Sequence, residues 1–227
     1  PAIAEALRLL GKDRLLLAVH DASFPGVSGE DAGRGSPYGA GGEGFAGFAR
    51  SLGFTGLQLG PQGQTSPVNA SPYDGTLFSR SLLSLDLKSM VEAGLLSRET
   101  WTGMVAGNPR PDGRRVAYAY ALQAYARMLE EVHSRYQDDR GEIAAFWRDN
   151  AWLRDDALYE ALGQEHGGLP WRQWPAQGEA GLDRLLCNPP LQLASACQAR
   201  RQALEARHAA TLERYAVGQW LLLQQHQ

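Results

Sequence analysis

The sequence has 227 residues, of which 44% are hydrophobic and 21% charged, and its formal net charge is −3. These values are typical of a soluble globular protein and offer no basic surface for nucleic acid. The first apolar run, Leu15 to Val19, is far too short to span a bilayer, and nothing resembles a signal peptide, so we expect no nucleic acid, no membrane and a cytoplasmic protein.

The first 60 residues predict a strand–helix–strand unit. A short helix that ends near Gly11 precedes a continuous apolar run at 14–19, which is typical of a strand buried on both faces. Apolar residues then recur at helical spacing over 43–52, Gly53 is placed to cap this helix, and 54–60 predicts a second strand. Two strands joined by a helix normally pair in parallel through a right-handed crossover.

The chain after residue 80 is expected to be mainly helical. One helix is predicted within 84–101, and 107–115 is rich in turn residues. Apolar residues over 118–136 fall on one helix face, which indicates packing on a core, and further helices are predicted near 141–163 and 193–225. A parallel sheet of two strands cannot cover both of its faces. Either more strands are hidden in the irregular segments, or they belong to a part of the protein that this chain does not include.

Glycines 39, 41 and 44 match the G-x-G-x-x-G pattern of dinucleotide-binding loops. That fingerprint needs its first glycine directly after a strand and an acidic residue at the end of the next strand. Here the first strand ends near Val19, about 20 residues before Gly39, and the second strand ends in GLQLGPQG without an acid. We therefore expect no nucleotide site in this loop.

Polar residues follow each predicted strand, at the end where parallel sheets carry ligands. His20, Asp21 and Ser23 follow the first strand, but neighbouring residues point in different directions, so a turn organised by the Asp21 and Ser23 side chains is favoured over a catalytic triad. The segment SPYDG (71–75) follows the second strand. Its hydroxyl, aromatic ring and carboxylate suit a sugar ring, and a turn with a packed Tyr73 explains it equally well.

Other polar residues are assigned structural roles. His166 lies at a predicted helix end, where its ring can meet the last carbonyls. The acid pairs Asp138–Asp139 and Asp155–Asp156 diverge on a helix, whereas glycoside chemistry needs two carboxyl groups that face each other across roughly 5 to 9 Å. Cys187 and Cys197 lack the partners for a zinc site and are expected to be reduced, with a disulfide between them as the alternative. No metal is indicated.

Nine short blocks occur in a fixed order along the chain. They are ASFPG (22–26), SPYG (36–39), LQLGP (57–61), SPYDGTLFS (71–79), SLDL (84–87), EAGLLS (92–97), DDALYEAL (155–162), HGGLPWRQWP (166–175) and GQWLLLQQ (218–225). Together they resemble the 4-α-glucanotransferases, the amylomaltases of glycoside hydrolase family 77. The LGP–SPY and HGG-PW–WP blocks are the more specific ones.

The resemblance implies an α/β fold that begins a (β/α)8 TIM barrel and carries a large, mostly helical insertion. Residues 1–80 would form the first βαβ part of the barrel with substrate loops, and 81–227 a helical insertion region leading toward a third strand that is not included. It implies no cofactor and, in starch or glycogen metabolism, transfer of α-1,4-glucan segments between maltooligosaccharides. The implied retaining mechanism uses a carboxylate nucleophile and a second carboxyl group as acid, then base.

The resemblance also assigns substrate-binding residues. Ser71 and Tyr73 match the Ser-Pro-Tyr element that borders the donor sugar, and Asp74 stands where many members have glutamine. His20 matches the family's H-P-T-S-L-P-G stretch, as does Ser23, whereas Asp21 departs from it. The family's catalytic carboxylates lie on later strands, so no catalytic residue is assigned and we expect this chain alone to be inactive. The alternative is a non-catalytic glucan-binding or partner-binding protein derived from the enzyme.

Overall fold

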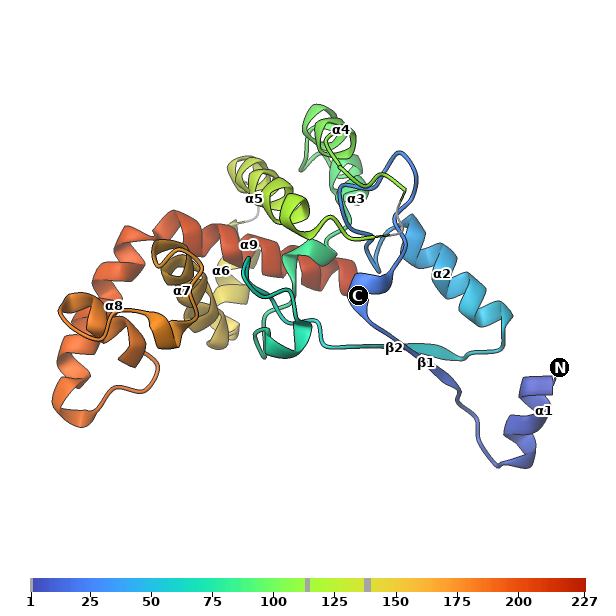
Figure 1. The fold of residues 1–227 in the computed structure, drawn as a ribbon, viewed down its shortest axis with the longest axis horizontal. Coiled ribbons are helices and arrows are strands. Elements are labelled where there is room, and N and C mark those ends of the chain that lie inside the picture. Colours follow the sequence, from blue (N-terminus) through green and yellow to red (C-terminus); the bar gives the residue numbers. More distant parts are fainter. Residues whose placement is uncertain (1, 113–114, 137–139) are drawn as a thin grey trace.

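The computed structural model describes residues 2–112, 115–136 and 140–227 (Figure 1). It begins with helix α1 (Ala2–Leu9), strand β1 (Leu16–Val19), helix α2 (Ala40–Ser51) and strand β2 (Gly56–Leu59). The two strands pair in parallel, with Leu16 opposite Gly56 and Val19 opposite Leu59. The predicted strand–helix–strand unit is therefore confirmed. Gly53 follows α2 with φ +97°, a left-handed conformation that favours glycine and ends the helix.

The prediction that the first strand is buried on both faces is wrong for this chain. Leu16 remains 51% exposed, and the residues of β1 alternate between exposed and half-buried. The cause is the size of the sheet, because β1 and β2 are the two strands of the sheet in the described residues and each has one unpaired edge. A buried parallel strand needs neighbours and covering helices on both sides.

Helices dominate the rest of the described chain. They are α3 (Leu87–Glu92), α4 (Arg98–Ala106), α5 (Tyr118–Arg135), α6 (Arg140–Asp149), α7 (Trp152–Glu165), α8 (Ala194–Arg207) and α9 (Ala209–His226). The long helix predicted over 118–136 is confirmed by α5. Each of the other three helices predicted after residue 80 corresponds to two helices in the structure. Gly94 at φ +74° separates α3 from α4, a turn at Asn150 separates α6 from α7, and His208 separates α8 from α9.

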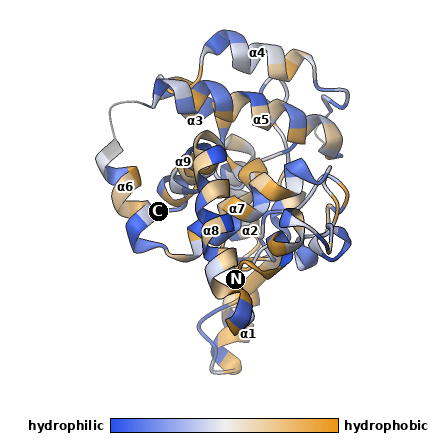
Figure 2. Ribbon diagram, turned by 90° about the vertical axis from the view of Figure 1, so that its left-hand side faces the viewer, coloured by the Kyte–Doolittle hydropathy of each residue, from blue (hydrophilic) through white to orange (hydrophobic). Residues whose placement is uncertain are grey.

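Helix α9 runs through the middle of the molecule, with α5, α6 and α7 packed along it (Figure 1). The side chains of Met128 and Val132 on α5, Leu153 on α7 and Leu222 on α9 are fully buried in this main core. Hydrophobic and hydrophilic residues are interleaved along most of the helices, as expected of helices that each bury one face (Figure 2). A second, smaller core joins α7 to α8 and contains Leu158, Leu162, Trp174, Leu186, Cys197 and Leu204.

Two glutamines of α9 hold the segment that follows β2. The Gln219 amide accepts from the Arg80 N–H at 2.9 Å and donates to the Arg80 carbonyl at 2.8 Å. The Gln225 amide makes the same pair of bonds to the backbone of Asp86, at 2.8 and 3.0 Å. Each side-chain amide thus takes the place of a neighbouring backbone strand. The backbone over 80–86 is fixed by a helix that lies 139 residues later in the sequence.

Candidate functional site

Two of the predicted site residues meet at the C-terminal ends of the strands. His20 directly follows β1, and Tyr73 lies in a short 3-10 helix, Pro72–Asp74, in the segment after β2. The Tyr73 Oη lies 3.3 Å from His20 Nε2, and the rings meet edge to face with centroids 5.6 Å apart. Tyr73 is 71% exposed, so a large part of its ring is free to stack on a ligand.

The other two predicted residues lie on the same short loop and are held by Asn69. The Ser71 N–H donates to Asn69 Oδ1 at 2.9 Å, and Asn69 Nδ2 donates to Asp74 Oδ2 at 3.0 Å. The Ser71 hydroxyl caps no backbone group of the 3-10 helix. Sequence reasoning missed Asn69, although an asparagine two residues before a turn is a common Asx-turn signal. All four predicted residues are therefore grouped at one place.

Gly60 makes room for the histidine. A Cβ at this position would lie 2.6 Å from His20 Nδ1, so a side chain here would displace the imidazole ring. Gly60 follows β2, and its N–H donates to the carbonyl of Val19 at 2.9 Å. The parallel pairing thus continues up to the point where the His20 ring is placed.

A buried ion pair lies directly behind His20. The carboxylate of Asp21 accepts from Arg34 Nη2 at 2.6 Å and from the Ser84 hydroxyl, and both charged side chains are at most 5% exposed. The prediction that the Asp21 and Ser23 side chains organise the turn is wrong for Asp21, because its carboxylate binds Arg34 instead of its own turn. Ser23 is exposed. A carboxylate in this position must be paired, since an unpaired buried charge is very costly.

The glycine-rich segment packs against the chain itself. A Cβ on Gly41 would lie 2.0 Å from the Pro25 carbonyl oxygen, and one on Gly39 would lie 2.5 Å from Asp86 Oδ1. Gly39 is the N-cap of α2, so the carboxylate of Asp86 already lies near the start of this helix. These glycines serve close approach of the backbone. Gly44, inside α2, has open space around it.

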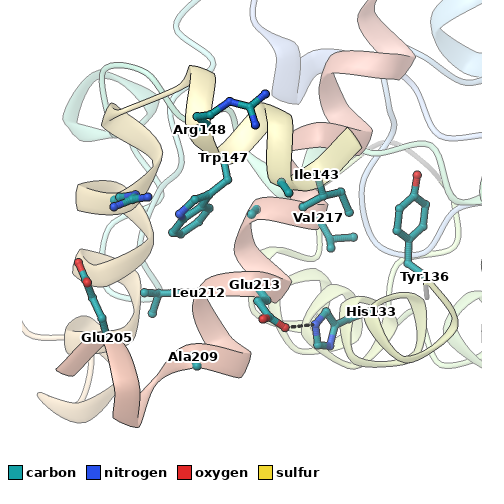
Figure 3. A pocket seen from close by; sticks show the side chains of 13 residues that line it. His133, Tyr136, Ile143, Trp147, Arg148, Glu205, Ala209, Leu212, Glu213 and Val217 are labelled. Atoms are coloured by element: carbon teal, nitrogen blue, oxygen red, sulfur yellow. Dashed lines mark ion pairs between the residues drawn. The ribbon is translucent and has the colours of Figure 1, made fainter. Parts of the chain in front are cut away.

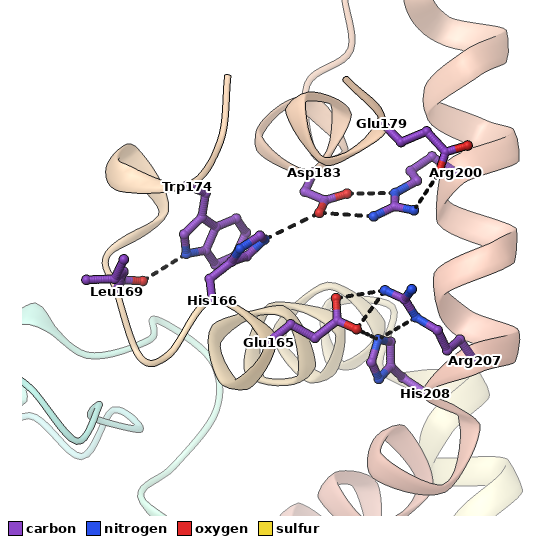
Figure 4. A network of polar contacts seen from close by, with 9 residues as sticks. All are labelled: Glu165, His166, Leu169, Trp174, Glu179, Asp183, Arg200, Arg207 and His208. Atoms are coloured by element: carbon purple, nitrogen blue, oxygen red, sulfur yellow. Dashed lines mark hydrogen bonds and ion pairs between the residues drawn. The ribbon is translucent and has the colours of Figure 1, made fainter. Parts of the chain in front are cut away.

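A polar network fixes the HGG-PW–WP block on α8 (Figure 4). His166 Nε2 lies 3.4 Å from Asp183 Oδ2, and its ring stacks on Trp174 with centroids 4.7 Å apart. Asp183 in turn accepts from Arg200 Nε at 2.8 Å. The prediction that the His166 ring meets the last helix carbonyls is therefore wrong. Beside this network, Glu165 pairs with Arg207 and His208, at 2.6 and 3.0 Å.

The remaining acids and thiols have separate surroundings. Asp155 accepts from Arg201 at 2.7 Å, whereas Asp156 accepts from the Ser79 N–H at 3.2 Å, so this pair diverges as predicted. The pair Asp138–Asp139 lies outside the described residues. Cys187 and Cys197 are both free, which excludes the disulfide alternative.

Within the described residues, no group of three or more His, Cys, Asp or Glu side chains is arranged to hold a metal ion. In the same residues, we find no helix with the length and apolar character needed to cross a membrane.

Comparison with known proteins decides the family. The sequence model described as 4-alpha-glucanotransferase matches residues 27–227. The chain belongs to this family. A 4-alpha-glucanotransferase of Thermus thermophilus is 33% identical over an alignment of 172 residues, and the match covers 70% of this chain and 30% of that protein. An amylomaltase from Streptococcus agalactiae, solved in complex with acarbose, superposes with a TM-score of 0.71 at 18% identity.

The chain spans only part of these relatives. The structural match covers 94% of this chain but 39% of the amylomaltase, so it shows that the two share a fold over this region. The resemblance that rests on the nine sequence blocks is thereby confirmed at the level of the family.

Proposed function

We propose that this chain is the start of a (β/α)8 barrel, with β1 and β2 as its first two strands. In this proposal residues 1–80 form the first βαβ part with its substrate loops, and 81–227 form a helical insertion leading toward a third strand. The parallel pairing of the strands supports it. So does the position of the end of α9, where His226 Nδ1 lies 3.2 Å from the Tyr38 hydroxyl, in the loop between β1 and α2.

We further propose that the protein acts as a 4-α-glucanotransferase, transferring α-1,4-glucan segments between maltooligosaccharides with retention. The observation that carries this is the exposed Tyr73 ring, set against His20 at the carboxyl ends of two parallel strands. That end of a barrel is where active sites lie. We assign no nucleophile and no general acid to this chain, and its part in the reaction is to hold a sugar.

Each residue of the group has a proposed role. The Tyr73 ring stacks on the apolar face of a glucose unit. His20, Ser71 and Asp74 form hydrogen bonds with its hydroxyl groups. Asp74 is suited to this because its Oδ2 is oriented by Asn69 while the side chain remains exposed. The buried Asp21–Arg34 pair keeps His20 in place from below.

The test is maltooligosaccharide binding and maltotriose disproportionation by the full-length protein and its variants. Tyr73→Ala should weaken binding by about 2- to 12-fold, because stacking contributes roughly 0.5–1.5 kcal/mol. Tyr73→Phe retains the ring and should bind nearly as well. Leu77→Ala, an equally local change at a residue that is 92% exposed, serves as the matched control. Unchanged binding in Tyr73→Ala would contradict the proposed role.

The alternative is a non-catalytic glucan-binding protein derived from the enzyme. It predicts that the full-length protein binds maltotriose through Tyr73 but releases no glucose from it. For the chain of 227 residues alone, our proposal also predicts no glucose release, since it contributes no catalytic carboxylate. Glucose release from maltotriose by this chain alone would overturn that assignment.

A further inference from the structure

A pocket of about 760 Å³ lies far along the chain from the proposed sugar site (Figure 3). It is lined by the C-terminal end of α5, by α6, by Arg154 of α7, and by the corner between α8 and α9, and all of its lining residues follow residue 132. Its size falls within the range of small-molecule sites, roughly 300–1,000 Å³. Ile143, Leu212 and Val217 give it an apolar floor.

Trp147 provides an aromatic surface inside this pocket. Its side chain, from α6, points into the space between the helices (Figure 3). The ring is half-buried, and the Arg154 guanidinium carbon lies 5.9 Å from its centroid. Such a contact between a guanidinium and an indole is attractive. The half-buried indole also packs against the main core, and it presents its remaining surface to the pocket.

Charged side chains from several helices line the pocket around this ring. On α5 and α9, His133 Nε2 lies 3.4 Å from Glu213 Oε2, and the Glu213 side chain is 71% exposed. Glu205 on α8 and the exposed Arg148 on α6 complete the rim. The pocket thus combines an apolar floor and an aromatic ring with hydrogen-bond donors and acceptors at its edge. A sugar ring has matching chemistry, with an apolar face and hydroxyl groups around its perimeter.

We propose that this pocket is an accessory binding site for an α-1,4-glucan chain, separate from the strand-end site. Trp147 stacks on one glucose unit, and Glu205 and Glu213 accept hydrogen bonds from its hydroxyl groups. The choice of glucan among sugars rests on the proposed function. A purely apolar ligand would leave the charged rim without partners, which is unfavourable on desolvation. A site of this kind would hold a long glucan while its end is processed elsewhere.

The experiment is calorimetric titration of maltoheptaose into the full-length protein that carries Tyr73→Ala, so that the strand-end contact is already weakened. Adding Trp147→Ala should weaken the remaining binding about tenfold, and Trp147→Phe, which retains a ring, should weaken it much less. Glu213→Gln removes the charge of an exposed side chain while keeping its size, and it should weaken binding a few-fold. Trp171→Ala, a half-exposed tryptophan that also stacks on an arginine but lies outside the pocket, is the matched control.

The outcomes separate this proposal from the proposed function. If Trp147→Ala and Glu213→Gln both bind maltoheptaose like their parent, the accessory site is wrong, whereas loss of transfer activity in Tyr73→Ala would leave the proposed function standing. Retained maltoheptaose binding that depends on Trp147, in a protein without transfer activity, would support the pocket and contradict the enzyme. Absence of any maltooligosaccharide binding would overturn both.

Discussion

Removing the carboxylate of Asp21 tests the structure at the point where fold and site meet. In Asp21→Ala the guanidinium of Arg34, whose side chain is 5% exposed, loses the partner that lies 2.6 Å away. Breaking one side of a buried ion pair costs about 3–5 kcal/mol, because the remaining charge is left uncompensated. The whole free energy of unfolding of a domain is only about 5–15 kcal/mol. We therefore expect a severe loss of stability from this single change.

Urea unfolding followed by circular dichroism measures the loss. With a denaturant dependence of about 2–3 kcal/mol per molar urea, the midpoint should fall by more than about 1 M. Asp21→Ala combined with Arg34→Met removes both charges and should recover much of the loss. Glu5→Gln removes a surface ion pair with Arg8 of similar length and should leave the midpoint unchanged.

A small loss of stability would contradict the role given to this ion pair. If Asp21→Ala unfolds with less than about 1 kcal/mol of lost stability, then Arg34 finds water or another partner, and the pair is not the rigid support of His20. If the ion pair supports His20, then maltooligosaccharide binding should also weaken in Asp21→Ala, because His20 directly precedes Asp21 in the chain.

Four further substitutions test the packing, a backbone contact of α9 and one partly buried carboxylate network. Gly41→Ala should lower the free energy of unfolding in urea by more than about 2 kcal/mol, because its Cβ would meet the Pro25 carbonyl. Gly44 has open space around it inside α2, so Gly44→Ala should raise the same free energy by about 1 kcal/mol. Equal effects of the two substitutions would contradict the described packing. Gln219→Ala should cost about 1–3 kcal/mol in the same assay, because the backbone groups of Arg80 lose both partners. Burial alone would raise the pKa of Glu131, but hydrogen bonds from Thr100 and Ser97 outweigh burial and lower it. The contribution of Glu131 to the free energy of unfolding is therefore present above the ordinary pKa of a glutamate and is lost as the pH falls through the lowered pKa. Glu131→Gln should remove this part of the acid sensitivity of thermal unfolding, and an unchanged dependence of the melting temperature on pH would contradict this prediction.

Local sequence patterns predicted much of the fold. The apolar run before His20 and the helical spacing over 43–52 depend on neighbours within a few residues, so both strands and α2 could be predicted. The split of the later helices was missed. Gly94, with φ +74°, ends α3 through local backbone hydrogen bonds and is a C-cap signal, whereas no glycine or proline marks the corner at His208. Periodicity indicates which face of a helix is apolar but not where tertiary packing interrupts it.

The candidate site was only partly visible in the sequence. Its residues were found by their position after two strands and by the resemblance, and the structure brings His20 and Tyr73 into contact. The buried group formed by Asp21, Arg34 and Ser84 could not be predicted, since Ser84 lies 63 residues from Asp21 in the sequence. The Trp147 pocket was likewise hidden, because it is formed by helices whose relative placement no local pattern contains.

The two glutamine contacts of α9 have a consequence for the time at which the protein can fold during synthesis. The side chains of Gln219 and Gln225 bind the backbone N–H and carbonyl groups of Arg80 and Asp86, and 139 residues separate each pair. At a synthesis rate of about 5–20 residues per second, that separation corresponds to roughly 7–28 s. During this interval the strands and the Ser-Pro-Tyr loop have been made, while the helix that fixes the segment after them has not. The segment over 80–86, which follows the Ser-Pro-Tyr loop, is therefore synthesised long before it can receive these hydrogen bonds from α9.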